Sequence, residues 1–161
     1  MSGGPTAEKR TTQKLIMFFI SLGFIAMLVI PALDRRYQRS TVPLPVVLAG
    51  DALVAVGFYF IFRVYQENSY TSATIEVAAG QRVISTGPYA IVRHPMYTSA
   101  LFFFVGLPLL LGSWWGLLLS VIFILAIAWR AVQEEGMLRA ELSGYEDYTA
   151  RVRYRLVPHV W

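Results

Sequence analysis

The sequence contains no cysteine and only two histidines among its 161 residues. A disulfide bond, a thiolate nucleophile and a cysteine-ligated metal site are therefore excluded. Two histidines are also too few for a histidine metal cluster, so we predict no bound metal. Charged residues are scarce as well, at 15% of the chain, whereas soluble domains carry about 25%. The composition argues against an ordinary soluble domain.

Apolar residues make up 56% of the chain and stand in long runs without charge. Leu15–Leu33 is uncharged throughout, and Leu44–Phe62 is interrupted only by Asp51. About 20 apolar residues cross the ~30 Å hydrocarbon core of a bilayer, so each run predicts one transmembrane helix. A carboxylate inside a membrane is costly. Asp51 therefore either caps or hydrogen-bonds a neighbouring helix or has a function of its own.

A third uncharged run, from Met96 to Trp129, is too long for a single span. Gly112-Ser113 and Trp114-Trp115 stand near its middle, where glycine favours a tight turn and tryptophans mark the membrane interface. The run therefore predicts two helices joined as a hairpin. Its second arm should continue out of the membrane and end near Ser143-Gly144, because glycine commonly terminates helices.

These runs predict an all-α integral membrane helical bundle, formed by a single domain over residues 1–161. It has about four transmembrane helices, at residues 15–33, 44–62, 96–111 and 114–133, after a disordered N-terminus of residues 1–14. Eleven of the 14 lysines and arginines lie in the N-terminus, in the 63–93 loop, or at and beyond residue 130. The positive-inside rule therefore predicts that the N-terminus, this loop and the C-terminus are cytoplasmic.

Polar residues gather where the third run begins, in Arg93-His94-Pro95-Met96-Tyr97. A residue before proline avoids the α region, so His94 should be extended, and Pro95 suits the first helical position. The backbone amides that follow lack helical partners and form a ready site for an anion. Alternatively, these side chains only anchor the helix among lipid headgroups. For Arg93, the choice between ligand and lipid stays open.

The predicted hairpin returns the chain to the same depth at Arg130 and Glu134, which lie four residues apart on one helix face. Such a pair can be an ordinary surface ion pair. Beside the start of the third helix, it contributes to a set of three binding groups. They are a helix N-terminus for a carboxylate, Glu134 for an ammonium, and a tyrosine ring for a cation. S-adenosylmethionine carries all three complementary groups.

The C-terminal tail contains Arg151, Arg153 and Arg155 between aromatic residues. We expect most of these arginines to lie on anionic lipid headgroups. The net charge of +4 is spread over loops and tail and forms no basic patch of the kind that binds nucleic acid. The predicted partner is therefore the lipid bilayer, and no nucleic acid.

Several short motifs follow one another in the second half of the chain. They are Gly87-Pro88-Tyr89, Arg93-His94-Pro95-Met96-Tyr97, the apolar hairpin, Arg130-x-x-x-Glu134-Glu135-x-x-Leu138 and Tyr145-x-x-Tyr148-x-x-x-Val152. In this order and spacing, residues 81–161 resemble the isoprenylcysteine carboxyl methyltransferase and phospholipid methyltransferase superfamily of membrane enzymes. The resemblance implies a multi-span helical fold without a soluble Rossmann domain. It also implies that S-adenosylmethionine is buried in the cytosolic half, beneath the loop and the tail, and that a lipophilic substrate enters from the bilayer.

The resemblance also implies roles for individual residues in the motif-bearing half, residues 81–161. The implied cofactor contacts are Gln81, Arg82, Val83, Ile84, Tyr89, His94, Pro95, Met96, Tyr97 and Glu134. Arg130 occupies the place of the arginine that binds the substrate carboxylate in the prenylcysteine enzymes. An amine or thiol substrate would need a base, for which His94 and Glu135 are the candidates.

We therefore predict an integral membrane methyltransferase that uses S-adenosylmethionine, most like a protein-S-isoprenylcysteine carboxyl O-methyltransferase. Alternatives in the superfamily are a phospholipid amine N-methyltransferase and a small thiol or lipid methyltransferase. Membrane sterol reductases, which use NADPH, share a histidine-proline-x-tyrosine turn, with asparagine after the proline and an acid soon after the tyrosine. Here Met96 follows the proline, and no acid closely follows Tyr97. A membrane protein without enzymatic activity is the remaining alternative.

Overall fold

The computed structural model describes residues 11–68 and 82–161, and these residues form helices and connecting segments without a strand. The four long helices are α1 (Thr11–Arg36), α2 (Leu44–Glu67), α3 (Pro95–Leu110) and α4 (Trp115–Glu141). A short 3₁₀ helix, η1 (Gly87–Ala90), precedes α3, and a two-turn helix, α5 (Tyr145–Arg151), follows α4. The predicted all-α fold is confirmed for this part of the chain.

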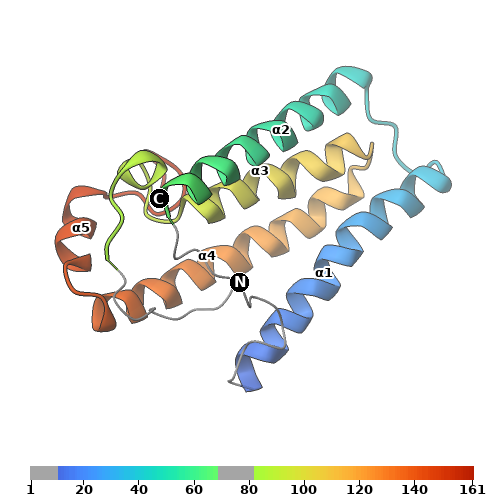
Figure 1. Cartoon of the computed structure of the whole chain (residues 1–161). Coiled ribbons are helices and arrows are strands. Elements are labelled where there is room, and N and C mark those ends of the chain that lie inside the picture. Colours follow the sequence, from blue (N-terminus) through green and yellow to red (C-terminus); the bar gives the residue numbers. More distant parts are fainter. Residues whose placement is uncertain (1–10, 69–81) are drawn as a thin grey trace.

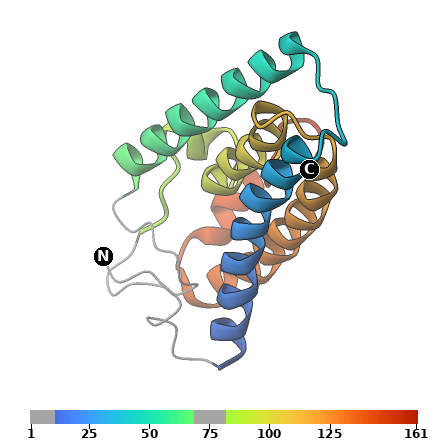
Figure 2. The ribbon, with the colours of Figure 1, turned by 90° about the vertical axis from the view of Figure 1, so that its right-hand side faces the viewer.

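The long helices pack around α3, which lies between α2 and α4 (Figures 1 and 2). Helix α1 packs on α4 and also touches α3. The short elements η1 and α5 lie at one end of these helices, beside the C-terminal ends of α2 and α4 (Figure 1). The bundle therefore has one end built from polar connections and short helices, and one end where α1 meets α2 and the α3–α4 turn.

Glycines let α2 approach α3 closely. Gly50 and Gly106 are buried at the contact, and a Cβ atom on either would overlap backbone or side-chain atoms of the other helix. Close backbone approach of this kind is the main source of packing energy between helices in a membrane. It also explains the position of Asp51. One residue along a helix is a rotation of about 100°, so Asp51 turns away from the face of Gly50. Its side chain is exposed and makes no hydrogen bond to the described residues.

The helix ends follow the local sequence. His94 has φ −123° and ψ 65°, outside the α region as Pro95 requires, and α3 begins at Pro95. Gly112 and Gly144 adopt positive φ values of 72° and 81° in the turns that follow α3 and α4. These are left-handed conformations that glycine adopts at little cost.

The helices extend beyond the predicted spans. Helix α1 begins at Thr11, inside the stretch predicted to be disordered, while residues 1–10 lie outside the described part of the chain. Helix α2 ends at Glu67, beyond the predicted end at residue 62, whereas α4 runs past its membrane span and ends at Glu141, close to the predicted end near Ser143-Gly144. The uncharged runs mark only the length suited to hydrocarbon. Segments without proline then extend an existing helix at low cost, because elongation is easier than nucleation.

The outer surfaces of the helices are apolar. Among the described residues, α2 and α4 are long and apolar enough to cross a membrane, whereas α3 is apolar but has only 16 residues. Only 11% of the residues in the most apolar stretch of α2, and 22% of those in α4, are buried within the chain. Large side chains such as Phe58 and Leu125 remain exposed. Apolar surface on this scale needs lipid or protein to cover it, which indicates a membrane protein.

Candidate functional site

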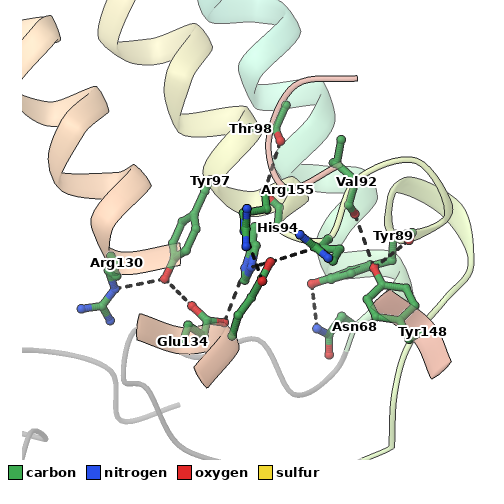
Figure 3. Close-up of polar contacts among 12 residues, drawn as sticks. Asn68, Tyr89, Val92, His94, Tyr97, Thr98, Arg130, Glu134, Tyr148 and Arg155 are labelled. Atoms are coloured by element: carbon green, nitrogen blue, oxygen red, sulfur yellow. Dashed lines mark hydrogen bonds and ion pairs between the residues drawn. The ribbon is translucent and has the colours of Figure 1, made fainter. Parts of the chain in front are cut away.

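Five side chains meet at the end of the bundle that carries η1 and α5. We call them the His94 cluster: His94 and Tyr97 at the start of α3, with Arg130, Glu134 and Glu135 from α4. The Tyr97 hydroxyl donates a hydrogen bond to Glu134 Oε2 at 2.6 Å and accepts one from Arg130 Nε at 3.0 Å (Figure 3). Thus the arginine and glutamate that were expected to face the start of α3 do so through one tyrosine oxygen.

His94 lies between two carboxylates. Its Nδ1 is 3.9 Å from Glu134 Oε1, and its Nε2 is 3.2 Å from Glu135 Oε1. The imidazole also stacks on the Tyr97 ring, with centroids 5.5 Å apart and planes inclined by 15°. Only 5% of His94 is exposed. Both ring nitrogens therefore face acids, and these contacts fix the orientation of the ring.

Glu135 is the charged centre of the site. It is 3% exposed, and its carboxylate faces three basic groups: His94, Arg93 Nε at 2.8 Å, and Arg155 Nε at 3.2 Å. Burial by itself raises the pKa of Glu135. The hydrogen bond with His94 and the charges of Arg93, His94 and Arg155 outweigh burial, so the net pKa is below its usual value. This residue lies beyond the predicted span, which ends at residue 133.

The pKa of Glu135 predicts how stability depends on pH. Because the pKa is lowered in the folded state, the stabilisation is complete above the usual glutamate pKa of ~4.3. It is lost as the pH falls through the lower native value. We expect the unfolding temperature of the detergent-solubilised protein to fall more steeply below about pH 4.5 in the wild type than in Glu135→Gln. Parallel pH profiles for the two proteins would contradict this role.

The C-terminal tail closes the same end of the bundle. The backbone amides of Arg93 and His94 donate to the carbonyl oxygens of Tyr154 and Arg155, at 2.9 and 3.0 Å. The Thr98 hydroxyl donates to the carbonyl oxygen of Leu156 at 2.7 Å. The tail therefore holds the polypeptide just before and within the first turn of α3.

Two arginines, Arg155 and Arg93, face a carboxylate of the protein. The guanidinium of Arg155 reaches inward to Glu135, so Arg155 is not among the arginines expected on lipid, while Arg151 and Arg153 are exposed. Arg93 was left open between ligand and lipid, but it is 8% exposed and faces Glu135. The buried carboxylate of Glu135 attracts both side chains. The hydropathy of the sequence does not reveal that these arginines face this carboxylate.

Tyr89, in η1, is held by hydrogen bonds from two other elements. Its hydroxyl accepts a hydrogen bond from Asn68 Nδ2 at 2.7 Å, at the end of α2, and its carbonyl oxygen accepts one from the Tyr148 hydroxyl at 2.8 Å. Tyr148, in α5, is 2% exposed, and burial raises the pKa of its hydroxyl, which keeps it a neutral donor. Sequence reasoning missed Asn68, and the Tyr145-x-x-Tyr148 spacing was the only signal for Tyr148.

The other residues expected to contact a cofactor are spread over the same end. Val83 packs against the apolar cluster of Leu142, Tyr145, Tyr148 and Val152, Ile84 is half-buried, and Arg82 is exposed. Pro95 is buried and Met96 half-buried in the first turn of α3. Gln81 lies outside the described residues. Across residues 11–68 and 82–161, no three His, Cys, Asp or Glu side chains lie close enough together to hold a metal ion.

Apolar helices with exposed surfaces and a buried polar cluster at one end define an integral membrane protein with a candidate ligand site. The chain belongs to the phospholipid methyltransferase family, whose match covers residues 46–143, more than half of its length. This family lies within the superfamily that the motifs resemble, so that resemblance is confirmed. The family implies a membrane methyltransferase. No curated protein sequence matches the chain.

The family match includes only part of the site. It covers α2 from its third residue on, η1, α3 and all of α4, and with them every member of the His94 cluster. It ends at residue 143, before α5 and the tail that supply Tyr148 and Arg155.

Proposed function

We propose that this chain is an integral membrane methyltransferase that uses S-adenosylmethionine and acts on a lipophilic acceptor, most like a protein-S-isoprenylcysteine carboxyl O-methyltransferase. The observation that carries the proposal is the Tyr97 hydroxyl, which joins Arg130 to Glu134 beside the buried ring of His94. The Tyr97 hydroxyl thus lies between Arg130, a basic group for an anionic acceptor, and Glu134, an acidic group for a cationic cofactor.

In this proposal all of residues 1–161 form one membrane domain with four spans, the last two forming a hairpin of α3 and α4. The uncharged run of α1, the exposed apolar faces of α2 and α4, and the short connection after α3 support it. The N-terminus, the 63–93 loop and the C-terminus face the cytoplasm, as the distribution of lysine and arginine predicts. The His94 cluster then lies at the cytosolic surface, where S-adenosylmethionine is available.

The donor set suits a zwitterionic, cationic ligand. Glu134 is partly exposed, with 27% of its side chain accessible, so one of its oxygens can accept an ammonium without breaking its bond to Tyr97. The first amides of α3 are placed to bind a carboxylate. The rings of Tyr97 and Tyr89 offer π faces for a sulfonium. The segment from Gln81 to Ile84 would complete the cofactor contacts.

Bound S-adenosylmethionine would supply an electrophilic methyl group, and the chain's own residues have to align and desolvate the acceptor. In-line transfer of the methyl group from the cationic sulfonium to an anionic carboxylate gives two neutral products. Exclusion of water therefore accelerates the transfer. Arg130 can hold an acceptor carboxylate through two parallel hydrogen bonds. No base is needed for that acceptor.

A second candidate is N-methylation of a phospholipid amine, the substrate class in the name of the matched family. This reaction needs a base to remove a proton from the amine. His94 is the candidate for that role, because its imidazole is held between Glu134 and Glu135 in the cluster. Glu135 fits poorly, because its carboxylate already faces Arg93, His94 and Arg155.

Labelled methyl transfer separates these candidates. Purified protein is incubated with methyl-labelled S-adenosylmethionine and either farnesylcysteine peptide vesicles or phosphatidylethanolamine vesicles. Label in a base-labile ester of the peptide supports carboxyl methylation, and base-stable label in the lipid supports N-methylation. If neither acceptor nor a total membrane extract gains label, while the protein remains folded, the proposed function is wrong.

A further inference from the structure

Helix α2 carries one charged residue inside its uncharged run. Asp51 lies seven residues, roughly 10 Å, from Leu44 at the start of the helix. Its side chain is exposed and makes no hydrogen bond to the described residues. An aspartate side chain is short, so it does not reach the membrane surface from this depth as lysine or arginine does. A carboxyl group that faces hydrocarbon is costly unless a neighbour supplies a hydrogen bond.

Asp51 belongs to a line of exposed side chains along α2. Its members recur at alternating spacings of four and three residues, which places them on one side of the helix. We call them the Asp51 stripe: Leu44, Leu48, Asp51, Ala55, Phe58 and Phe62, all of them exposed. Gly50 and Gly57, which approach α3, are buried on another side of α2. The packing of α2 on α3 therefore leaves the stripe uncovered (Figures 1 and 2).

The stripe has the features of a contact between two helices. Side chains at alternating spacings of three and four residues interdigitate with those of a second helix. One polar residue among them fixes the register and the number of helices, at a cost in stability. Ala52 and Ala55 are exposed within one turn of Asp51. Small residues let two membrane helices approach closely enough for polar side chains to hydrogen-bond between them.

The carboxyl group also limits what the second helix is. Residues 15–33, 44–62 and 96–129 contain no lysine or arginine, so these runs offer no basic group inside the membrane. Two carboxyl groups hydrogen-bond to each other when at least one of them keeps its proton, because a carboxylate only accepts. A second copy of this chain has the same orientation in the membrane and presents Asp51 at the same depth. A two-fold axis along the membrane normal then brings each residue of the stripe opposite its counterpart.

We propose that the Asp51 stripe is the interface of a homodimer in the membrane. Two parallel α2 helices pair about a two-fold axis, and the two Asp51 carboxyl groups share a hydrogen bond through a proton that at least one of them keeps. The His94 cluster is built from α3 and α4 of a single copy, so the dimer leaves each cluster complete. The interface does not depend on methyl transfer.

Disulfide cross-linking in membranes tests the interface. The chain contains no cysteine, so each introduced cysteine is the only thiol of its variant. Position 55 lies on the stripe, whereas Ala49, which is also exposed, lies about 120° away around the helix. We expect oxidation to convert Ala55→Cys into a covalent dimer at least tenfold faster than Ala49→Cys. Equal rates in the two variants, or no covalent dimer of Ala55→Cys, would overturn the proposal.

A second measurement tests the pair of carboxyl groups. The dimerisation constant of the full chain is measured by energy transfer between labelled copies at increasing dilution in detergent. Asp51→Leu should dimerise about tenfold more weakly, the effect of an interhelical hydrogen bond in a membrane. Asp51→Asn should keep the wild-type constant, because an amide both donates and accepts. Ala49→Leu is the control away from the stripe and should also keep it.

Two results of this measurement would overturn the proposal: a monomeric wild type, or an unchanged constant in Asp51→Leu. Because Asp51 is exposed and makes no contact that holds the described fold together, Asp51→Leu is expected to fold. Transfer of labelled methyl groups is a separate readout, so failure of the dimer leaves the proposed function standing, and the reverse holds as well.

Discussion

Glu134→Gln is expected to weaken binding of S-adenosylmethionine about 100-fold, whereas Arg130→Gln keeps the affinity and loses methyl transfer to a similar degree. The first factor is the value of a hydrogen bond between two charged groups, ~1.5–3 kcal/mol. Glutamine keeps the size of Glu134 and can still accept the bond from Tyr97, so the variant removes charge and little else. Arg130 should act on the acceptor, and its loss should therefore appear in kcat/KM for that acceptor.

Calorimetric titration gives the cofactor affinity, and initial rates with labelled cofactor give the transfer. Glu141→Gln is the matched control, because it is an exposed glutamate at the end of the same helix. If both variants lose cofactor affinity equally, Glu134 and Arg130 do not have the separate roles proposed for them. If neither loses it, the cofactor does not bind at the His94 cluster.

Glu135→Ala should produce the largest loss of stability. It leaves Arg93 buried beside no carboxylate, leaves His94 with Glu134 alone, and releases Arg155 of the tail from α4. Removal of one partner from a buried ion pair costs about 3–5 kcal/mol. The control is Glu146→Ala, which removes an exposed ion pair with Arg139 at 3.4 Å. Exposed pairs are worth about 0–1 kcal/mol.

Thermal unfolding in detergent, followed by circular dichroism, measures both changes. A second readout is proteolysis of the tail, which should become faster in Glu135→Ala because Arg155 no longer ties the tail to α4. Equal unfolding temperatures for Glu135→Ala and Glu146→Ala would show that the buried network does not hold this end of the bundle together.

The parts of the site that follow helix periodicity could be predicted from the sequence. The length of the uncharged run and the Gly112-Ser113 turn placed Arg130 and Glu134 level with His94, and Tyr97 was included as one turn farther along α3. Pro95 fixed the start of α3 and the backbone of His94. These deductions need only local geometry and the alternation of apolar and polar segments.

The contacts that could not be predicted join segments distant in the sequence. Arg155 reaches Glu135 because the tail pairs its carbonyl oxygens with the amides of Arg93 and His94. The pattern of apolar and polar residues does not predict a backbone contact between two irregular segments. Glu135 had been considered as a base, but its three basic partners come from two such segments. Asp34 directly follows the first uncharged run, and only the fold brings it to Ser113 and buries it.

The most direct test of the central claim is calorimetric titration of the purified protein with S-adenosylmethionine, with its demethylated product, and with NADPH. We expect saturable binding of the first two at one site per chain, and none of NADPH. Binding of S-adenosylmethionine should be weakened about 100-fold in Glu134→Gln and unchanged in Arg39→Gln, at the opposite end of the bundle. Binding of NADPH alone, or of no ligand by folded protein, would contradict a methyltransferase site at His94, Tyr97 and Glu134.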